Sequence, residues 1–241
     1  MTALDDLAPV PFHDADAPQR ARMLSRLADT ELVVALRAEP AGDTIELRMF
    51  PLDGGPVALA CDAEDRLAGF LGGPVAYAAM PGRMLAGLLK SQGAGLLVNP
   101  GHPSEMLLDA AMLDWLIGAL SVAPQATDAR LRPTAPAPAV VQALAQPLAE
   151  RLGDMRGLIA GAALAGTGNG HAVLIAGADP AHQPAIAKAL AEALAFLPPQ
   201  PGGVDVSFTD AVLPPAVLQF DLAVPREPAP APRLKGPPIL R

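Results

Sequence analysis

Gly95-Leu96-Leu97-Val98-Asn99-Pro100-Gly101 is the stretch of this chain that says most about its fold. An apolar run is closed by Asn-Pro-Gly, which is typical of a turn because proline fixes φ, glycine permits positive φ and asparagine bonds the turn backbone. The pattern predicts a buried strand over residues 96–98. Ser104 is expected to cap a helix over residues 104–120. We therefore expect a strand–turn–helix junction here.

The expected helix over residues 104–120 carries three polar positions after Ser104, which are Glu105, Asp109 and Asp114. A polar stripe this narrow predicts that protein covers most of the helix surface. Trp115, the single tryptophan of the chain, is then the largest core residue of the helix. Asp109 and Asp114 are interpreted as one solvated stripe.

The residues before Gly95 alternate between amphipathic segments and short β-prone runs that turn residues separate. Helices are expected over residues 19–28, 63–71 and 82–91, with Asp16 and Asp62 as the N-caps of the first two. Strands are expected over residues 31–36, 45–50, 56–60 and 74–80. The first two strands are interpreted as a hairpin because turn residues lie between them.

Residues 121–138 have the composition of a linker, with four prolines among alanines and threonines. We place a domain boundary here, between residues 1–120 and residues 139–223. The second half is expected to form helices over 139–152 (kinked or restarted at Pro147) and 183–197, and strands over 158–165, 172–176, 203–208 and 216–222. The expected fold class is α/β, of the mixed α+β kind, with two small domains, each a mixed sheet packed by helices, and an extended proline-rich tail over residues 224–241.

The chain is 51% hydrophobic but only 3% aromatic, so small side chains must build its core, and its bias is typical of a GC-rich bacterial genome. Its charge is uneven. Residues 1–120 hold 8 Lys/Arg and 16 Asp/Glu, whereas residues 121–241 hold 9 of each. An acidic half argues against nucleic-acid binding, because neutralising phosphates needs clustered Lys and Arg. An acidic half is compatible with a basic protein partner, and it is equally compatible with a charge that only keeps the protein in solution.

Cys61 is the single cysteine, so no disulfide within the chain is expected. The first residues are acidic where a secretory leader is basic, and no apolar segment follows them. The sequence also lacks a window of about 18 uninterrupted apolar residues, as a membrane span requires. We therefore expect a cytoplasmic protein without membrane insertion.

The first half resembles the N-terminal domain of the SseB family, which is named for an enhanced serine sensitivity phenotype in enteric bacteria. The likeness is carried by a strand pair, by Phe50-Pro51-Leu52-Asp53-Gly54 before an aspartate-capped helix, and by Gly95–Gly101. The chain departs from the family at Ala60-Cys61-Asp62, where the family has a phenylalanine-threonine-serine corner. Residues 139–220 are similar in element order to the family's smaller C-terminal domain. The resemblance implies a cytoplasmic α/β protein without an established catalytic activity.

Cys61 is the candidate nucleophile, because a helix beginning at Asp62 would lower the pKa of its thiol. A sulfurtransferase-like role would need a loop that cradles an anion, and such loops are commonly basic. The loop here is Asp62-Ala63-Glu64-Asp65, which would repel an anionic substrate and raise the thiol pKa. The favoured interpretation of Cys61 is a small buried residue.

The other candidate sites also have simpler structural interpretations. Asn99 to His102 are interpreted as a turn, with a polar pocket as the alternative. Gly166-Thr167-Gly168-Asn169-Gly170 precedes strand-like residues, not a helix, so it predicts a hairpin and not a nucleotide loop. The four histidines lack metal-ligand spacing; they are His13, His102, His171 and His182. We expect no catalytic residue, cofactor site or metal site.

The proline-rich tail is the most suggestive element for function, because extended basic segments dock into grooves at low ordering cost. Its candidate partner-binding residues are Arg226, Arg233, Leu234, Lys235, Ile239, Leu240 and Arg241. A disordered terminus is the alternative. We expect a non-catalytic accessory subunit that binds a larger protein assembly through an acidic N-terminal surface and this arm, and that can also form a homo-oligomer. The alternatives are a small-molecule-binding protein, a thiol enzyme using Cys61, or, from the family name alone, a regulator of amino-acid metabolism.

Overall fold

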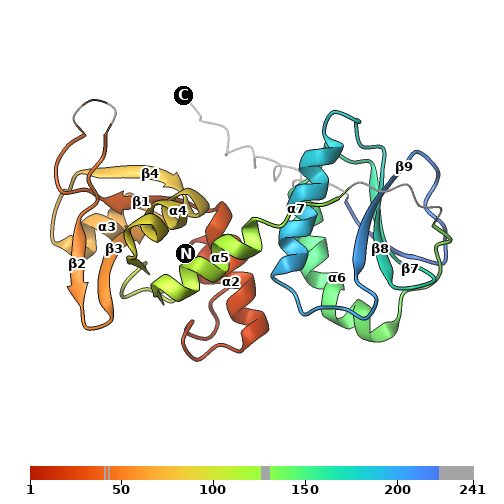
Figure 1. Cartoon of the computed structure of the whole chain (residues 1–241), viewed down its shortest axis with the longest axis horizontal. Helices are drawn as coiled ribbons and strands as arrows, with labels where there is room; N and C mark the ends of the chain where they lie inside the picture. The colour runs from red at the N-terminus through yellow and green to blue at the C-terminus, as the bar shows by residue number, and fades with distance from the viewer. Residues whose placement is uncertain (41, 43, 126–130, 223–241) are drawn as a thin grey trace, which may run out of the picture.

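Two β-sheets, each accompanied by helices, organise the chain and lie toward opposite ends of its long axis, with helices between them (Figure 1). The computed structural model describes residues 1–40, 42, 44–125 and 131–222. Strands between residues 31 and 108 form the first sheet, and strands between residues 161 and 220 form the second. The expected fold class, α/β with two mixed sheets, is confirmed. The tail over residues 224–241 lies outside the described residues.

The first sheet has the strand order β4-β1-β3-β5-β6, and β2 pairs with β3. β3 and β5 run parallel, while the other pairs are antiparallel. The strands are β1 (Glu31–Ala35), β2 (Met49–Leu52), β3 (Gly55–Cys61), β4 (Tyr77–Pro81), β5 (Gly95–Val98) and β6 (Met106–Leu108). The accompanying helices are α1 (Ala3–Asp6), α2 (Ala17–Asp29), α3 (Glu64–Leu71), α4 (Gly82–Gln92) and α5 (Ala110–Leu120).

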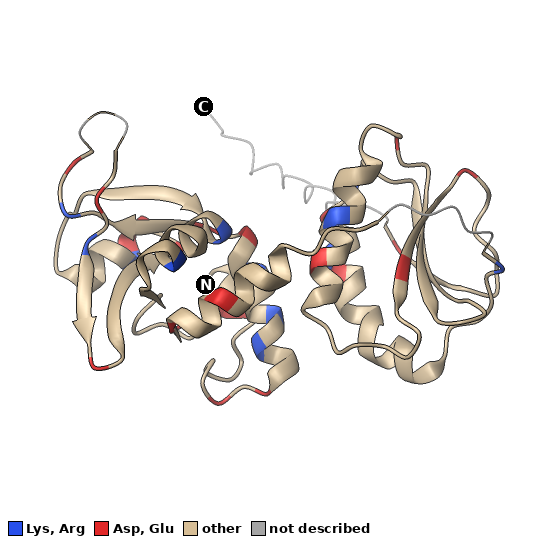
Figure 2. Cartoon of the chain, viewed as in Figure 1, with Lys and Arg blue, Asp and Glu red and all other residues tan. Residues whose placement is uncertain are grey.

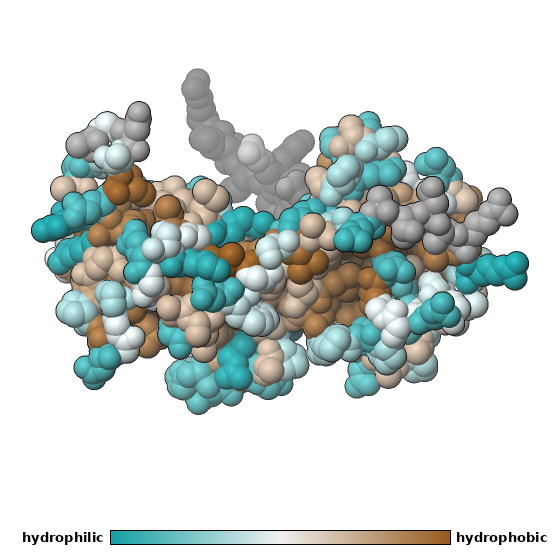
Figure 3. Space-filling model, viewed as in Figure 1, coloured by the Kyte–Doolittle hydropathy of each residue, from teal (hydrophilic) through white to brown (hydrophobic). Residues whose placement is uncertain are grey.

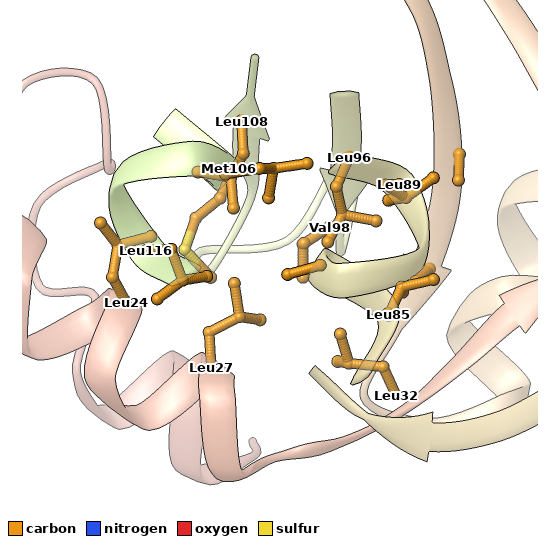
Figure 4. Close-up of a cluster of buried hydrophobic side chains, with 14 of the residues drawn as sticks. Leu24, Leu27, Leu32, Leu85, Leu89, Leu96, Val98, Met106, Leu108 and Leu116 are labelled. Atoms are coloured by element: carbon orange, nitrogen blue, oxygen red, sulfur yellow. The ribbon is translucent and has the colours of Figure 1, made fainter. Parts of the chain in front are cut away.

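The main core lies between this sheet and the helices α2, α4 and α5 (Figure 4). Alternate residues of β5, Leu96 and Val98, reach the same face of the sheet because side chains alternate along a strand. Leu27 of α2, Leu85 of α4 and Leu116 of α5 converge on them and are almost completely buried. Each such leucine contributes about 1.5–3 kcal/mol of transfer free energy. This packing fixes the position of the β5 end, where Asn99 begins the turn.

The second sheet has the strand order β10-β7-β8-β9, with β8 and β9 parallel. Its elements are α6 (Pro138–Gly153), β7 (Gly161–Gly166), β8 (His171–Ala176), α7 (Gln183–Ala195), β9 (Val204–Thr209) and β10 (Leu218–Phe220). α6 buries Val140, Leu144, Leu148 and Leu152, which recur at steps of four and so share one helix face. α6 does not restart at Pro147, which lies inside the helix.

The expected helix over residues 104–120 is wrong in its first turn. Met106–Leu108 form the strand β6, and α5 begins at Ala110 with Asp109 as its N-cap. Met106 is buried whereas Leu107 is 52% exposed, an alternation with the period of two that defines a strand. The junction is therefore strand–turn–strand. Trp115 is also not a core residue, since it is 47% exposed.

Two further local expectations need correction. Asp62 is not the N-cap of α3; Ala63 holds that position, without a side-chain cap. The expected hairpin of residues 31–36 and 45–50 is reduced to one bridge, between Leu36 and Leu47. The reason is that β3 and β4 already occupy the two edges of β1.

The glycine pair of α4 provides a matched test of this packing. A Cβ on Gly82 would lie 2.1 Å from the Leu27 carbonyl oxygen, whereas a Cβ on Gly87 would meet open space. We expect Gly82→Ala to destabilise the protein by about 1–3 kcal/mol or more, because the backbone of α2 must move. We expect Gly87→Ala to stabilise it by about 0.5–1 kcal/mol, because alanine favours the helix interior. Urea unfolding of both variants checks the sign of each change, and equal effects would contradict the described contact of α2 with α4.

Candidate functional site

Asn99 holds the turn that follows β5. Its φ is +46°, which makes it the one non-glycine residue with positive φ in the described parts of the chain. Asparagine tolerates this conformation better than most residues. Its buried side chain joins two neighbours: Oδ1 accepts from the backbone N–H of Asp62 at 3.0 Å, and Nδ2 donates to Oγ of Ser104 at 2.9 Å. The turn interpretation of this segment is consistent with these bonds.

The hydrogen bonds of Asn99 lead into a buried polar network. Ser104 donates its hydroxyl to the carboxylate of Asp5 at 2.6 Å, and Arg66 donates to both oxygens of the same carboxylate. Arg66 also lies 3.2 Å from a carboxylate oxygen of Asp62, which accepts from the hydroxyl of Thr2 through its other oxygen. The N-terminal helix α1 is thereby fastened to the ends of β3 and β5.

The network lies just beyond the carboxyl ends of the parallel strands β3 and β5. In open α/β sheets this edge is a common place for ligands. Here the chain's own α1 fills it: the side chains of Asp5 and Arg66 are only 3% and 11% exposed. Arg66 holds the pKa of Asp5 well below its usual range, because the guanidinium hydrogen-bonds the charged carboxylate. Most polar groups of this edge therefore satisfy one another; Asp62 Oδ1, which is buried without a hydrogen bond, has only the ion pair with Arg66.

Sequence reasoning missed Asp5 and Arg66, because nothing local links residues 61 positions apart. One signal was present: Thr2 and Asp5 form a capping box, in which each side chain bonds the other's backbone N–H. That pattern predicts α1, but it does not predict that Asp5 is buried.

Cys61 ends β3 and is completely buried. Burial raises the pKa of its thiol to about 11, since the charged thiolate is poorly solvated there. The interpretation as a small buried residue is consistent with this environment. An exposed, low-pKa thiol, which a nucleophile needs, is not what this position provides.

The remaining sequence candidates do not come together. Gly166–Gly170 joins β7 to β8 as a hairpin, as expected. Within the described residues, no group of three or more His, Cys, Asp or Glu side chains is placed to hold a metal ion. The described helices are also too short or too polar to cross a membrane. The seven candidate partner-binding residues of the tail, from Arg226 to Arg241, lie outside the described residues.

A cluster of charged residues joins the two halves of the molecule. Arg83 of α4 pairs with Asp29 of α2 and with Glu192 of α7, and Arg151 of α6 pairs with the second oxygen of Asp29. The side chain of Glu192 is only 6% exposed. It is buried because α7 packs against α5 across the junction, where Glu192 meets Arg83 of α4. Lys188 pairs with Glu192 and donates to the carbonyls of Leu120 and Val122.

An aromatic contact lies at the same junction. Trp115 of α5 meets Phe196, just after α7, edge to face at a centroid distance of 5.6 Å. Arg22 of α2 and Glu150 of α6 form a further ion pair at 2.7 Å. Helices α2 and α5 of the first half thus contact α6 and α7 of the second (Figure 1).

The buried pair of Asp5 and Arg66 predicts a pH-dependent stability. Because the folded-state pKa of Asp5 is lowered, its contribution is present above about pH 4 and is lost as the pH falls further. We expect Asp5→Asn to destabilise the protein by about 3 kcal/mol at pH 7, since the buried Arg66 then keeps only Asp62 as a charged partner. The difference from the parent should shrink toward pH 2. Asp6→Asn is the control, because Asp6 is the exposed neighbour in α1. Urea titrations at several pH values measure both variants, and a pH-independent deficit would contradict the role of the ion pair.

The burial of Cys61 predicts that thiol reagents do not reach it in the folded protein. We expect alkylation by iodoacetamide at pH 7.5 to be far slower than for a free thiol, because both access and the thiolate fraction are low. Addition of urea above the unfolding midpoint should restore the full rate. Rapid labelling of the native protein would revive the thiol-enzyme alternative.

Comparison with known protein families supports the resemblance stated above. Residues 11–115 match the family model described as the SseB protein N-terminal domain. The matched stretch runs from just before α2 to the middle of α5, so it includes the whole first sheet and the Asn99 turn. Neither the curated proteins nor the solved structures compared with the chain gave a match. Over residues 11–115 the chain is thus similar to the N-terminal domain of the SseB family.

Proposed function

We propose that this protein is a non-catalytic, cytoplasmic interaction module, an accessory subunit that binds a larger protein assembly. The binding surface is the exterior of the first half, and the basic C-terminal arm reinforces it. The single observation that carries the proposal is the uneven distribution of exposed apolar side chains between the two halves.

Exposed large hydrophobic residues are concentrated in the first half. Of the fourteen found among the described residues, twelve precede residue 125, and the second half has only Leu158 and Val212. Figure 3 shows hydrophobic residues (brown) at the surface of both halves in this view. The exposed ones of the first half include Met84 and Leu88, one turn apart on α4, and Leu107 on the edge strand β6. Methionine and aromatic residues of this kind are enriched where proteins bind one another.

The same half presents an acidic exterior, because ion pairs within the chain already neutralise most of its basic residues. Five of its eight Lys/Arg form ion pairs, among them Arg66 within the network and Arg83 at the junction. Exposed carboxylates such as Asp6, Glu39 and Asp53 form no ion pair within the described residues. Figure 2 shows how acidic (red) and basic (blue) residues are distributed over the fold. A partner that suits this surface carries Lys or Arg beside apolar side chains.

The arm over residues 224–241 supports the proposal by its sequence alone, since it adds basic residues and the apolar pair Ile239 and Leu240. The thiol-enzyme alternative has less support, because Cys61 is buried and its pKa is raised. A pocket at the Asn99 turn has less support too, because α1 fills that edge of the sheet.

A co-purification experiment tests the proposal. We expect the full chain, isolated at low salt from the cell that produces it, to retain a partner in stoichiometric amount. The double variant Leu88→Ser with Leu107→Ser should weaken retention at least about tenfold, because buried apolar anchors dominate interface free energies. Deletion of residues 225–241 should also weaken it.

The matched control is Leu158→Ser with Val212→Ser, which removes exposed apolar side chains from the second half and should leave retention unchanged. Recovery of a monomer alone at low salt would contradict the proposal. So would equal loss in both double variants.

A further inference from the structure

A pocket lies at the junction of the two halves, between α2, α6 and the C-terminal end of α7. α2 contributes Arg22, Ser25 and Arg26, and α6 contributes Arg151 and Asp154. Apolar side chains complete the wall: Leu7, Pro147, Phe196 and Leu197. Junctions between domains are a frequent location for small-molecule sites.

The hydrogen-bond donors of this pocket outnumber its acceptors. The Nε atoms of Arg22 and Arg151 are buried and have no hydrogen-bond partner. The guanidinium of Arg26 pairs with no carboxylate within the described residues. Buried N–H groups of charged side chains are costly when they lack an acceptor. Arg22, Arg26 and Arg151 thus each bring to the lining of this pocket a donor that lacks an acceptor.

The neighbouring carboxylates are already engaged. Glu150 accepts from the terminal nitrogen of Arg22, and Asp29 accepts from Arg151 and Arg83. Asp154 is the remaining carboxylate of the lining; it is exposed and makes no ion pair within the described residues. The unmatched groups inside the pocket are therefore positive, and one negative group lies on its wall.

We propose that this pocket binds a small oxyanion, a phosphate or carboxylate group, between α2 and α6. The anion accepts from the Nε–H groups of Arg22 and Arg151, one from each half, and from the guanidinium of Arg26. Arginine N–H groups suit an oxyanion because their charge-assisted hydrogen bonds are short and directional. Since the donors come from both halves, a bound anion stabilises the contact between α2 and α6. A ligand in this pocket therefore also affects the protein-binding surface that we propose for the first half.

Titration of the full chain with inorganic phosphate tests the site, with sodium chloride holding the ionic strength constant. Calorimetry gives the dissociation constant. The fluorescence of Trp115 provides a second signal, because Trp115 contacts Phe196 of the pocket wall. Succinate in a parallel titration distinguishes a carboxylate ligand from a phosphate ligand. Binding of either one above the chloride background supports the proposal and assigns the anion.

Three variants on the pocket and its helix sharpen the test. Arg26→Gln should weaken binding about tenfold, because a charged donor is lost. Asp154→Asn should tighten binding severalfold, because a like charge is removed from the wall. Arg20→Gln, on the same helix but outside the lining, should leave the affinity unchanged. All three are exposed or half-buried surface positions, so folding is retained. If phosphate and succinate both act no more strongly than chloride, or if Arg26→Gln binds as the parent does, the proposal is overturned.

Discussion

The arrangement of the first half depends on the ion pair of Asp5 and Arg66. Placing two charges where they are 3% and 11% exposed costs solvation free energy, and the attraction between them repays it only when the remaining donors and acceptors are also satisfied. Ser104 and Asp62 supply those partners, and Asn99 joins both of them to the turn after β5. The positive φ of Asn99 is thus held in place by bonds on both sides of its amide group. One network therefore fixes α1, the start of α3 and the ends of two parallel strands.

Elements whose information is local could be predicted from the sequence. The four-residue spacing of α6, the Asp16 cap of α2 and the β7–β8 hairpin all follow from neighbouring residues. β6 could not be predicted, because three apolar residues beside a helix carry no distinct period until a partner strand is known. The same limit applies to residues 45–50, whose expected partner β1 has both edges occupied by strands from elsewhere in the chain.

The chemistry of the candidate site was less predictable than the fold, for a physical reason. Each of its bonds joins residues distant in sequence: 61 positions separate Asp5 from Arg66, and 99 separate Asp5 from Ser104. Local patterns predict which side chains are polar, but not which of them share a buried site. Glu192 shows the consequence: nothing in the sequence of its helix links it to Arg83, and only the packing of α7 against the first half makes the two partners. Cys61 was simpler, because it ends an apolar run whose last five residues are all buried.

The arginine at the sheet edge and those at the junction are used differently, and this difference separates the two proposals. At the sheet edge the guanidinium of Arg66 is matched by the carboxylates of Asp5 and Asp62, although Asp62 Oδ1 makes no hydrogen bond. At the junction Arg22 and Arg151 each use a terminal nitrogen for an ion pair, and their Nε atoms remain without an acceptor. Arginines paired with carboxylates of their own domain favour a structural role, whereas unmatched buried donors favour a ligand. We therefore interpret the edge of the first sheet as a structural centre, and we propose the exterior of that half for protein binding and the junction for a small anion.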